Sequence, residues 1–586
     1  RSIDQEFDAY DGVILSLIQC KTQAQKQLLR TMFGIPPRAQ MTVTVHETLN
    51  VEELYLIPAI DHENEQGPYV MRRAFYVGHG IETNREYLFD GYTLPDPNTQ
   101  AATHVFADAQ QSETSLETYT PTRSIVHTLH GAFTPSTTQD VFDKLDDIAT
   151  ALSTHITHIY GRNDLHIAVD LVFHSPLSFH FDNTLLKKGW LEALIIGDTR
   201  TGKGFVTEGL ANHYGVGEVV SGENVTIAGL VGGVQRVGDH WTLVWGKIPL
   251  ADRRIIVIDE CGSLSQSDIA RLSRIRSEGV AEVTKILSEK TTSRTRLIWL
   301  GNPRPFTPSP HSPSGATSRL IADYNYGIEC VPELIGAAED VARFDFALVV
   351  AQNEVSSSLI NKRHKPADAA AFPYLPPICR QLITWVWSRT PEQIKFDSKA
   401  TTLTLKMAGD MGKRFSPKIT LVQAEDVRFK IARIAAAAAA RTFSTKDGQT
   451  LLVTKEHVEF AYNFLQHIYS KPACGYTQLS AAIHEREILR DPKGVTAILE
   501  TAGTYMLDLI EGLLEHRHIT ARDMCDYAGV DLFEARTIIS EMVRHRAIIK
   551  EHQWYVKKPS FRNHLQKLKT QLSNSDPHTT QGDDDE

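Results

Sequence analysis

The sequence predicts a multidomain α/β protein whose central domain is built on a parallel β-sheet. Three apolar segments, LEALIIGD, RRIIVIDE and TRLIWLGN, alternate with segments of helical composition between residues 191 and 302. Strands that are apolar on successive residues are buried on both faces, as they are in parallel α/β sheets. A β-rich region precedes this domain, and helical regions follow it.

The length and composition are typical of a multidomain globular chain. Its 586 residues exceed what one hydrophobic core accommodates. No apolar run approaches the ~20 residues of a membrane span, so we expect no membrane segment. The first residues lack a signal-peptide pattern, and we expect an intracellular location in the cytoplasm or nucleoid. The net charge of -10 argues against a uniformly basic nucleic-acid binder but leaves room for a basic channel in an assembly.

Five regions follow from the pattern along the chain. Residues 1–140 begin as a helix up to about Phe33 and continue with β-forming segments typical of a small barrel. Residues 141–360 form the α/β core. Residues 361–475 are helical, and their alanine-rich run IARIAAAAAARTF predicts a closely packed helix, with low complexity as the alternative. Residues 476–560 predict a winged helix, or else a protein-contacting module, and the acidic residues 561–586 a disordered tail.

The segment GDTRTGKG lies between an apolar strand and a helical segment, which is the context of a phosphate-binding loop. Backbone N–H groups at the helix start surround a triphosphate, and Lys203 adds a positive charge. The Ser or Thr that usually follows this lysine and binds Mg²⁺ is Gly204 here. We therefore expect Mg²⁺ to rely on water and Asp259, or on Thr201 or Thr207 in a rearranged loop. The expected nucleotide-binding residues of this segment are Gly197, Asp198, Thr199, Arg200, Thr201, Gly202, Lys203, Gly204 and Phe205.

Polar residues end the next two apolar strands. RRIIVIDE delivers Asp259 and Glu260 to the carboxyl edge of the sheet, where ligands bind in open α/β folds. Asp259 would hold the magnesium shell, and Glu260 would orient the attacking water. TRLIWLGN ends in Asn302, which we expect to reach the γ-phosphate. The alternative, a surface acidic pair, does not explain why four apolar residues precede it.

The segment of residues 159–348 resembles the minichromosome-maintenance (MCM) branch of the AAA+ ATPases. IYGRNDLHIAVDLVF resembles the entry segment of that family, which implies that Ile159 and Tyr160 lie by the adenine. SGENVTIAGLVGGVQRVGDHWTLVWGKIPLAD resembles an inserted hairpin that lines the pore of the ring, with Gln235 and Arg236 near its tip. GVAEVTKILSEKTTSRTRLIWLGNP resembles a second hairpin, whose tip lysine, here Lys285, touches DNA.

The same resemblance implies two arginines that act on the ATP of a neighbouring subunit. GAAEDVARFDFALVV makes Arg343 the expected arginine finger, and AEDVRFKIARIAAAA makes Arg428 the second sensor on a helical lid. For each arginine the alternative is a surface ion pair. An arginine that neutralises charge on a transferring phosphoryl group changes the rate by roughly 10³-fold or more. If the finger comes from a neighbour, hydrolysis requires assembly, and we expect a homo-hexamer.

Two features depart from the family. Its zinc ribbon, which accompanies an oligonucleotide-binding (OB) barrel, has no counterpart, because six scattered cysteines without a CxxC pair cannot form one; we expect no zinc. Gly204 is the second departure, and together they suggest a bacterial, viral or mobile-element relative. The expected function is an ATP- and Mg²⁺-dependent DNA helicase with possible replication partner proteins. The alternatives are a chelatase-like or MoxR-like remodeller of protein partners and a DNA-loading scaffold without unwinding activity.

Overall fold

The computed structural model describes residues 27, 30, 31, 34–36, 38–40, 50–56, 72–82, 85–95, 102–111, 115–237, 240–284, 288–305, 319–360, 372–487, 491–516, 518–551 and 553–573. The chain divides into two compact units, residues 1–413 with 417–475 and residues 414–416 with 476–586. Most of the helix expected up to Phe33, and the acidic residues after Ser573, lie outside the described residues.

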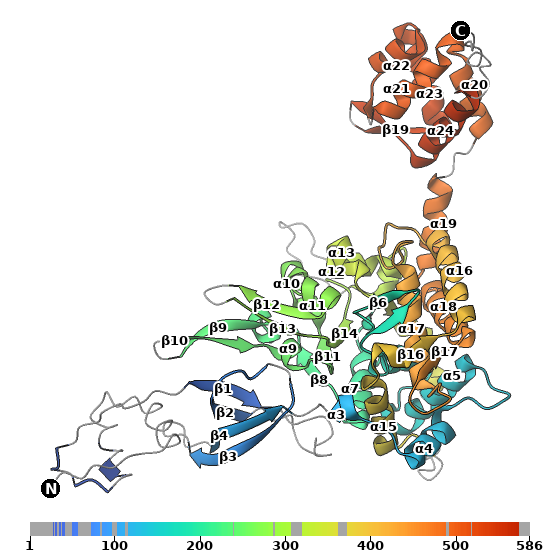
Figure 1. Ribbon diagram of the computed structural model, residues 1–586. Coiled ribbons are helices and arrows are strands. Elements are labelled where there is room, and N and C mark those ends of the chain that lie inside the picture. Colours follow the sequence, from blue (N-terminus) through green and yellow to red (C-terminus); the bar gives the residue numbers. More distant parts are fainter. Residues whose placement is uncertain are drawn as a thin grey trace, which may run out of the picture. The chain divides into compact units, whose positions relative to one another are not determined.

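The core of the first unit is a five-stranded parallel sheet (Figure 1). Its strands lie in the order β15 (Phe346–Val350), β7 (Glu192–Gly197), β14 (Arg296–Gly301), β11 (Ile255–Asp259) and β8 (Glu218–Ser221). Every residue of β15, β7 and β14 is buried. The predicted parallel α/β core is therefore confirmed, and the continuous apolar runs have the burial that two covered faces require.

Four helices form the packing around this sheet. α6 (Asn163–Phe173) contacts β7 and β14, and α7 (Lys203–Tyr214) packs on α6. α17 (Val427–Arg441) contacts α6 and α18 (Lys455–Ser470), and α18 reaches β15. The alanine run of α17, Ala435–Ala440, is completely buried, because small side chains let neighbouring backbones approach closely. The predicted closely packed helix is thus confirmed.

A buried polar cluster joins three of these helices. Asp170 of α6 accepts hydrogen bonds from Arg441 Nε of α17 at 2.5 Å and from Tyr214 Oη of α7 at 2.6 Å. His174 Nδ1 lies 3.2 Å from the same carboxylate. Burial alone would raise the pKa of Asp170, but Arg441 and His174 hold that pKa well below its usual range. The cluster therefore links the C-terminal end of α7, at Tyr214, to α17.

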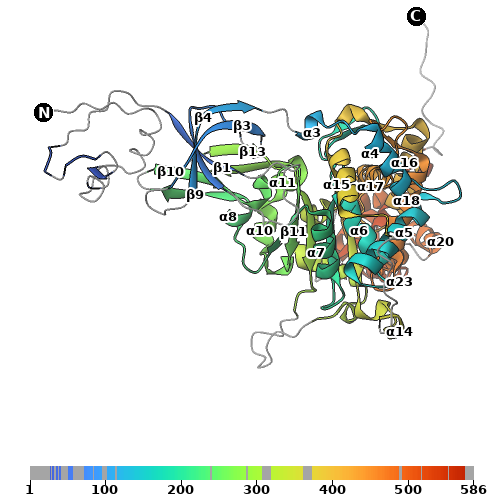
Figure 2. The same ribbon diagram turned by 90° about the horizontal axis from the view of Figure 1, so that it is seen from below.

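Two antiparallel hairpins extend from the core. β9 (Gly232–Val237) pairs with β10 (His240–Trp245), and β12 (Val280–Thr284) pairs with β13 (Ser288–Thr292). Figures 1 and 2 show that the two hairpins project from the same side of the sheet. They occupy the two segments for which the sequence implied hairpins.

The N-terminal region contains a separate four-stranded sheet. Its order is β1 (Val51–Leu56), β2 (Arg72–Val77), β4 (Ala102–Gln111) and β3 (Tyr87–Pro95), and the β2–β4 pair is parallel. Over the described ranges the sheet is open, so the barrel remains a prediction. The short helix α3 (Ser115–Thr118) and the helices α4 (Arg123–Phe133) and α5 (Val141–Leu152) follow it.

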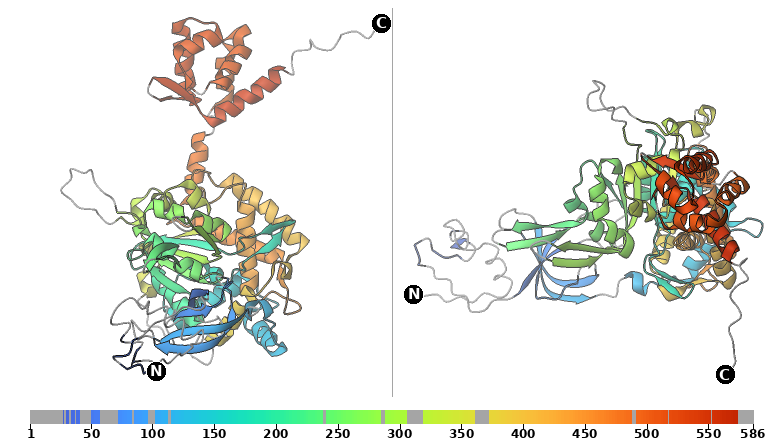
Figure 3. Two further views of the ribbon diagram at one scale, coloured as in Figure 1. Left: turned by 60° about the vertical axis from the view of Figure 1, so that its left-hand side comes forward. Right: turned by 90° about the horizontal axis from the view of Figure 1, so that it is seen from above.

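The second unit combines helices with a small antiparallel sheet (Figure 3). Its elements are α19 (Tyr476–Glu487), α20 (Pro492–Glu500), α21 (Met506–Glu515), β18 (His518–Ile519), α22 (Ala521–Ala528), α23 (Leu532–Arg544), β19 (Ile548–Glu551), β20 (Trp554–Lys557) and α24 (Pro559–Ser573). Phe561 and Leu565 of α24 lie in its core, beyond residue 560, where we expected the domain to end. The winged helix stays a prediction.

The described cysteines are free thiols. Four cysteines, Cys261, Cys330, Cys379 and Cys474, are buried free thiols, and Cys525 is a half-buried one. None of the helices in the described ranges combines the length and apolar composition that crossing a bilayer requires.

Candidate nucleotide-binding site

The loop between β7 and α7 has the backbone geometry of an anion cradle. Gly202, which precedes α7, has a φ of 91°, and Arg200 has a φ of 61°. A Cβ on Gly202 would lie 2.8 Å from Cγ2 of Ile159. Glycine is therefore required at this position, and the same contact places Ile159 directly against the loop. Positive φ values turn successive N–H groups toward one point, where an anion binds.

Lys203 is buried at the centre of the loop, with 8% of its surface exposed. Its Nζ donates to the carbonyl oxygens of Gly197 at 2.9 Å and Asp198 at 2.8 Å, and to Asn302 Oδ1 at 3.1 Å. Burial lowers the pKa of Lys203 to about 8, although Glu260, Asp198 and Asp259 favour its charged form. The ammonium group is thus held by groups that a phosphate oxygen can replace.

The acidic pair stands where β11 ends, next to Lys203. Glu260 has a left-handed backbone, with a φ of 52°, and its N–H donates to Asp259 Oδ1 at 2.9 Å. Asn302 follows β14 and bridges the site, because its Nδ2 donates to Glu260 Oε2 at 3.4 Å while its Oδ1 binds Lys203. Burial is the largest cause that raises the pKa of Glu260, and the negative charges of Asp259 and Glu223 raise it further. A more basic carboxylate is a better proton acceptor for an attacking water.

The position of Gly204 leaves room for a side chain next to Asp259. An added Cβ on Gly204 would meet Asp259 Oδ2 at 3.8 Å and no other atom within 4 Å. The hydroxyls of Thr201 and Thr207 are committed to the backbone, since they donate to Asp198 O at 2.9 Å and Lys203 O at 3.0 Å. Within the described ranges no group of three or more His, Cys, Asp or Glu side chains could hold a metal ion alone. Magnesium would thus rely on Asp259, water and phosphate oxygens.

Asp198 has a structural role that the sequence did not reveal. Its buried carboxylate accepts from the N–H of Ile321 at 2.8 Å and from the N–H of Gln352 at 2.9 Å. Gln352 in turn donates through Nε2 to Thr199 O at 3.2 Å. These bonds fix the loop to Ile321, which precedes β15, and to Gln352, which follows it. The partners are 123 and 154 residues away in the chain, so no local pattern could have identified them.

The side of the loop that faces Ile159 is held by a second set of charges. Arg162 is buried and pairs with Glu354 at 2.6 Å, and Glu354 also binds Lys471 at 2.7 Å. A Cβ on Gly161, whose φ is 72°, would lie 2.9 Å from side-chain atoms of Leu359 and Val355. The segment from Ile159 to Arg162 is thereby fixed between the loop and the residues after β15.

The two predicted arginines contact other groups of their own chain. Arg343 Nη1 pairs with Asp340 Oδ1 at 2.8 Å. Arg428 is exposed on α17, and its guanidinium lies 4.6 Å from the centre of the Phe429 ring. Neither has a recorded contact with Lys203 in the part of the chain that is described. The predicted DNA contacts Gln235 and Arg236 lie on β9, whereas Lys285 lies outside the described residues.

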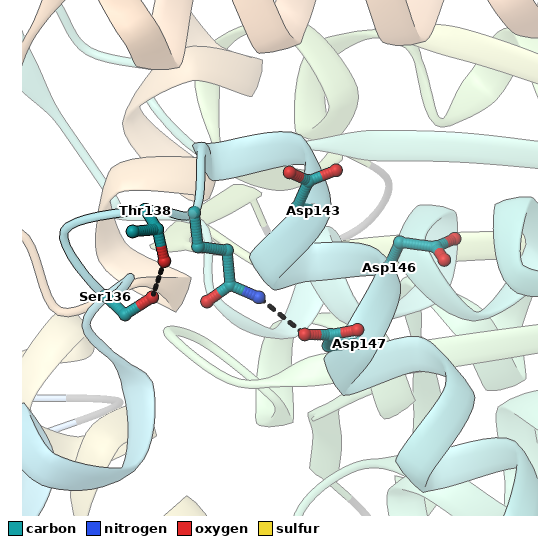
Figure 4. A pocket seen from close by; sticks show the side chains of 6 residues that line it. Ser136, Thr138, Asp143, Asp146 and Asp147 are labelled. Carbon is teal, nitrogen blue, oxygen red and sulfur yellow. Dashed lines mark hydrogen bonds between the residues drawn. The ribbon is translucent and has the colours of Figure 1, made fainter.

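Phe205, in the first turn of α7, is 76% exposed. Figure 4 shows a pocket beside α5 that none of the predicted site residues lines. It is formed by Ser136, Thr138, Gln139, Asp143, Asp146 and Asp147. Two of its carboxylates are already bonded, Asp146 to Asn163 and Asp147 to Gln139, so the pocket is an acidic surface feature.

The parallel sheet, the loop around Lys203 and the strand-end residues have the arrangement of a P-loop domain. Residues 137–304 match the family model for the MCM P-loop domain. In this domain the chain is MCM-like, as the resemblance implied.

Curated relatives match part of the chain. The DNA replication licensing factor mcm5 of Dictyostelium discoideum is 24% identical over 178 residues, which cover 29% of this chain and 23% of the relative. The mcm5-A protein of Xenopus laevis is 23% identical, with 29% and 24% covered. The minichromosome maintenance protein MCM of Saccharolobus solfataricus is 27% identical over 157 residues, with 26% and 23% covered. The chain spans about a quarter of the length of these relatives.

Proposed function

We propose that this chain is an ATP-hydrolysing motor of the MCM type that moves along DNA as a hexameric ring and separates its strands. The observation that carries this proposal is the contact of Lys203 and Glu260 with the single side chain of Asn302 at the mouth of an MCM-type P-loop. An intracellular location and replication partners belong to the same proposal.

The side chains would divide the chemistry among them. Lys203 exchanges the carbonyl oxygens of Gly197 and Asp198 for phosphate oxygens and neutralises their charge. Glu260 accepts the proton of the attacking water, and Asn302 fixes the distance between that carboxylate and Lys203. Bound magnesium would supply Lewis-acid stabilisation of the phosphate charge, held by Asp259.

Each site would be completed by a neighbouring subunit. Within one chain, Arg343 pairs with Asp340 and Arg428 lies on the exposed side of α17. In the described residues, Lys203 is hydrogen-bonded within the site, whereas Arg343 and Arg428 contact groups elsewhere in the chain. A second copy that presents Arg343 and Arg428 would add positive charge opposite Lys203 and make the hydrolysis rate depend on assembly.

The two hairpins would transmit hydrolysis to DNA. β11 ends at Asp259, and the strand after the second hairpin, β14, ends just before Asn302. Hydrolysis of the nucleotide bound at these strand ends would shift the hairpin β12–β13. It would also shift the hairpin β9–β10, which projects on the same side (Figure 2). Contacts made to phosphates by such hairpins weaken with salt and do not depend on sequence.

The test is the rate of ATP hydrolysis with and without single-stranded DNA, followed by strand displacement on a forked duplex. We expect DNA to stimulate hydrolysis and the unaltered chain to displace the strand. Lys203→Ala should lose both activities, and Lys455→Ala, which removes a half-exposed lysine of α18, should keep both. Hydrolysis that DNA leaves unchanged would instead favour a remodeller of protein partners, and stimulation without displacement a loading scaffold.

A further inference from the structure

Arg343 is held at both ends by neighbouring groups. Its guanidinium Nη1 lies 2.8 Å from Asp340 Oδ1, one turn earlier on the short helix α13 (Ala338–Ala342). Its carbonyl oxygen accepts from Lys188 Nζ at 3.1 Å. The side chain is 23% exposed, so one face remains open to a ligand or a neighbour.

Asp340 is a buried carboxylate that two arginines share. Its side chain is 3% exposed, and it lies 3.4 Å from Nη1 of the fully buried Arg276. Ser273 Oγ donates to the same oxygen at 3.2 Å. A buried carboxylate with three donors on one oxygen has little rotational freedom, because each alternative rotamer would leave a charge unpaired.

Arg276 connects this carboxylate to the first residue of β7. Its Nε donates to Glu192 Oε1 at 2.5 Å, and its Nη2 donates to the backbone carbonyl of Asp340 at 2.9 Å. The guanidinium lies 4.4 Å from the centre of the Phe344 ring. β7 runs from Glu192 directly into the phosphate loop at Gly197, so the anchor of Arg343 is rigidly joined to the ATP site of the same chain.

The helix α17 contacts the segment around Arg343 from the other side. Arg433 Nε of α17 donates to Asp345 Oδ1 at 2.5 Å, and the other oxygen of Asp345 accepts from the N–H of Glu192 at 2.8 Å. Lys430 Nζ of the same helix donates to Ala342 O at 2.7 Å. Residues 340–345 are therefore fixed between β7 and α17, and Arg343 is the charged residue of this segment whose side chain is partly exposed.

We propose that Asp340 is a positioning residue that sets the direction of Arg343 for the ATP held by a neighbouring subunit; this rests on the proposed function. A guanidinium on four rotatable bonds reaches many positions, and only a few of them neutralise a transferring phosphoryl group. The ion pair with Asp340 occupies Nη1 and leaves Nη2 and Nε to face the phosphate. Nothing local in the sequence distinguishes Asp340 from the adjacent Glu339.

The test is a double-mutant cycle on assembled rings with Asp340→Asn, Arg343→Ala and the double variant. Asp340→Asn keeps the shape of the side chain and removes its charge, while Arg276 retains Glu192 as a partner. The matched control is Asp268→Asn, which alters a surface aspartate that pairs with Arg271 at the same i,i+3 spacing. Single-turnover hydrolysis of labelled ATP measures slow variants, and ATP affinity and the thermal midpoint are measured in parallel.

We expect Asp340→Asn to lower kcat by roughly 10- to 100-fold, with ATP affinity close to that of Asp268→Asn. Its thermal midpoint should be lower than that of Asp268→Asn, because the substitution removes a buried charge that pairs with Arg276. In the Arg343→Ala background Asp340→Asn should add nothing. Equal kcat values for Asp340→Asn and Asp268→Asn would overturn the positioning role. So would effects of Asp340→Asn and Arg343→Ala that are independent of each other, and neither result would affect the proposed function. Full DNA-stimulated hydrolysis by Arg343→Ala would instead overturn the proposed arrangement of subunits, which keeps the two failures distinct.

Discussion

Gly204→Ser should restore the hydroxyl that this phosphate loop lacks. Gly204 is the second residue of α7, and a Cβ there would lie 3.8 Å from Asp259 Oδ2 with no other atom within 4 Å. The added serine therefore meets no steric resistance and faces the carboxylate that we expect to hold magnesium. The exchange also removes a glycine from the first turn of a helix, which reduces the conformational entropy lost on folding.

The expected gain in metal affinity follows from replacing a coordinated water. Releasing one immobilised water contributes up to about 2 kcal/mol, and a ligand fixed in the helix is already ordered. A gain of about 1.4 kcal/mol corresponds to tenfold tighter binding. We therefore expect the dissociation constant of the divalent ion from the ATP complex to fall by about tenfold.

Electron paramagnetic resonance of Mn²⁺, titrated into the protein with saturating ATP, measures this constant directly. Gly204→Ala fills the same space without a hydroxyl, and Gly409→Ser makes the same exchange in α16 (Ser398–Arg414), where a Cβ would have no neighbour within 4 Å. Only Gly204→Ser should tighten Mn²⁺ binding. If Gly204→Ala tightens it equally, the hydroxyl is irrelevant and our account of the metal site is wrong.

Three further outcomes are expected. Burial lowers the pKa of Lys203 to about 8, and bound phosphates favour its charged form, so ATP binding should take up a proton above pH 8. The ATP affinity, measured by calorimetry, should weaken by up to about tenfold per pH unit above pH 8. An affinity that stays constant up to pH 9.5 would contradict this. Arg441→Met removes the arginine that pairs with the buried carboxylate of Asp170 and should cost about 3–5 kcal/mol in urea unfolding, against less than 1 kcal/mol for Lys455→Met. Glu260→Gln should bind ATP normally while its single-turnover hydrolysis falls at least a hundredfold; retained hydrolysis would remove Glu260 from the mechanism.

The acidic end of the pH range tests the same buried cluster. Asp170 has a lowered pKa in the folded chain, so its carboxylate stabilises the fold above its ordinary pKa and loses that effect as the pH falls toward the folded value. Arg441→Met removes the cation that lowers this pKa. The difference in unfolding free energy between the two proteins should therefore shrink between pH 5 and pH 2.

The sequence predicted the core because its signals are local. The apolar runs of β7, β11 and β14 and the polar residues at their ends follow each other directly in the chain, and the carboxyl ends of parallel strands meet at one edge. The buried alanines of α17 were likewise predictable from composition and helix propensity.

The scaffold around the site was not predictable, because it depends on long-range pairing. Asp198 reaches Ile321 and Gln352, and Glu192 reaches Arg276, across more than 80 positions each. A charged residue in a single sequence carries no sign of which distant partner neutralises it. Asp340 is the clearest case, since only the fold reveals that it is buried and shared by Arg276 and Arg343.

Mixing two inactive variants tests most directly whether neighbouring copies complete each ATP site. Lys203→Ala removes the phosphate-binding charge and Arg343→Ala the finger, so rings of either variant alone should not hydrolyse ATP. In rings assembled from both, interfaces that combine an intact Lys203 with a neighbour's intact Arg343 should recover DNA-stimulated hydrolysis, highest near equal proportions. No recovery at any ratio in rings proven to contain both variants would contradict the account.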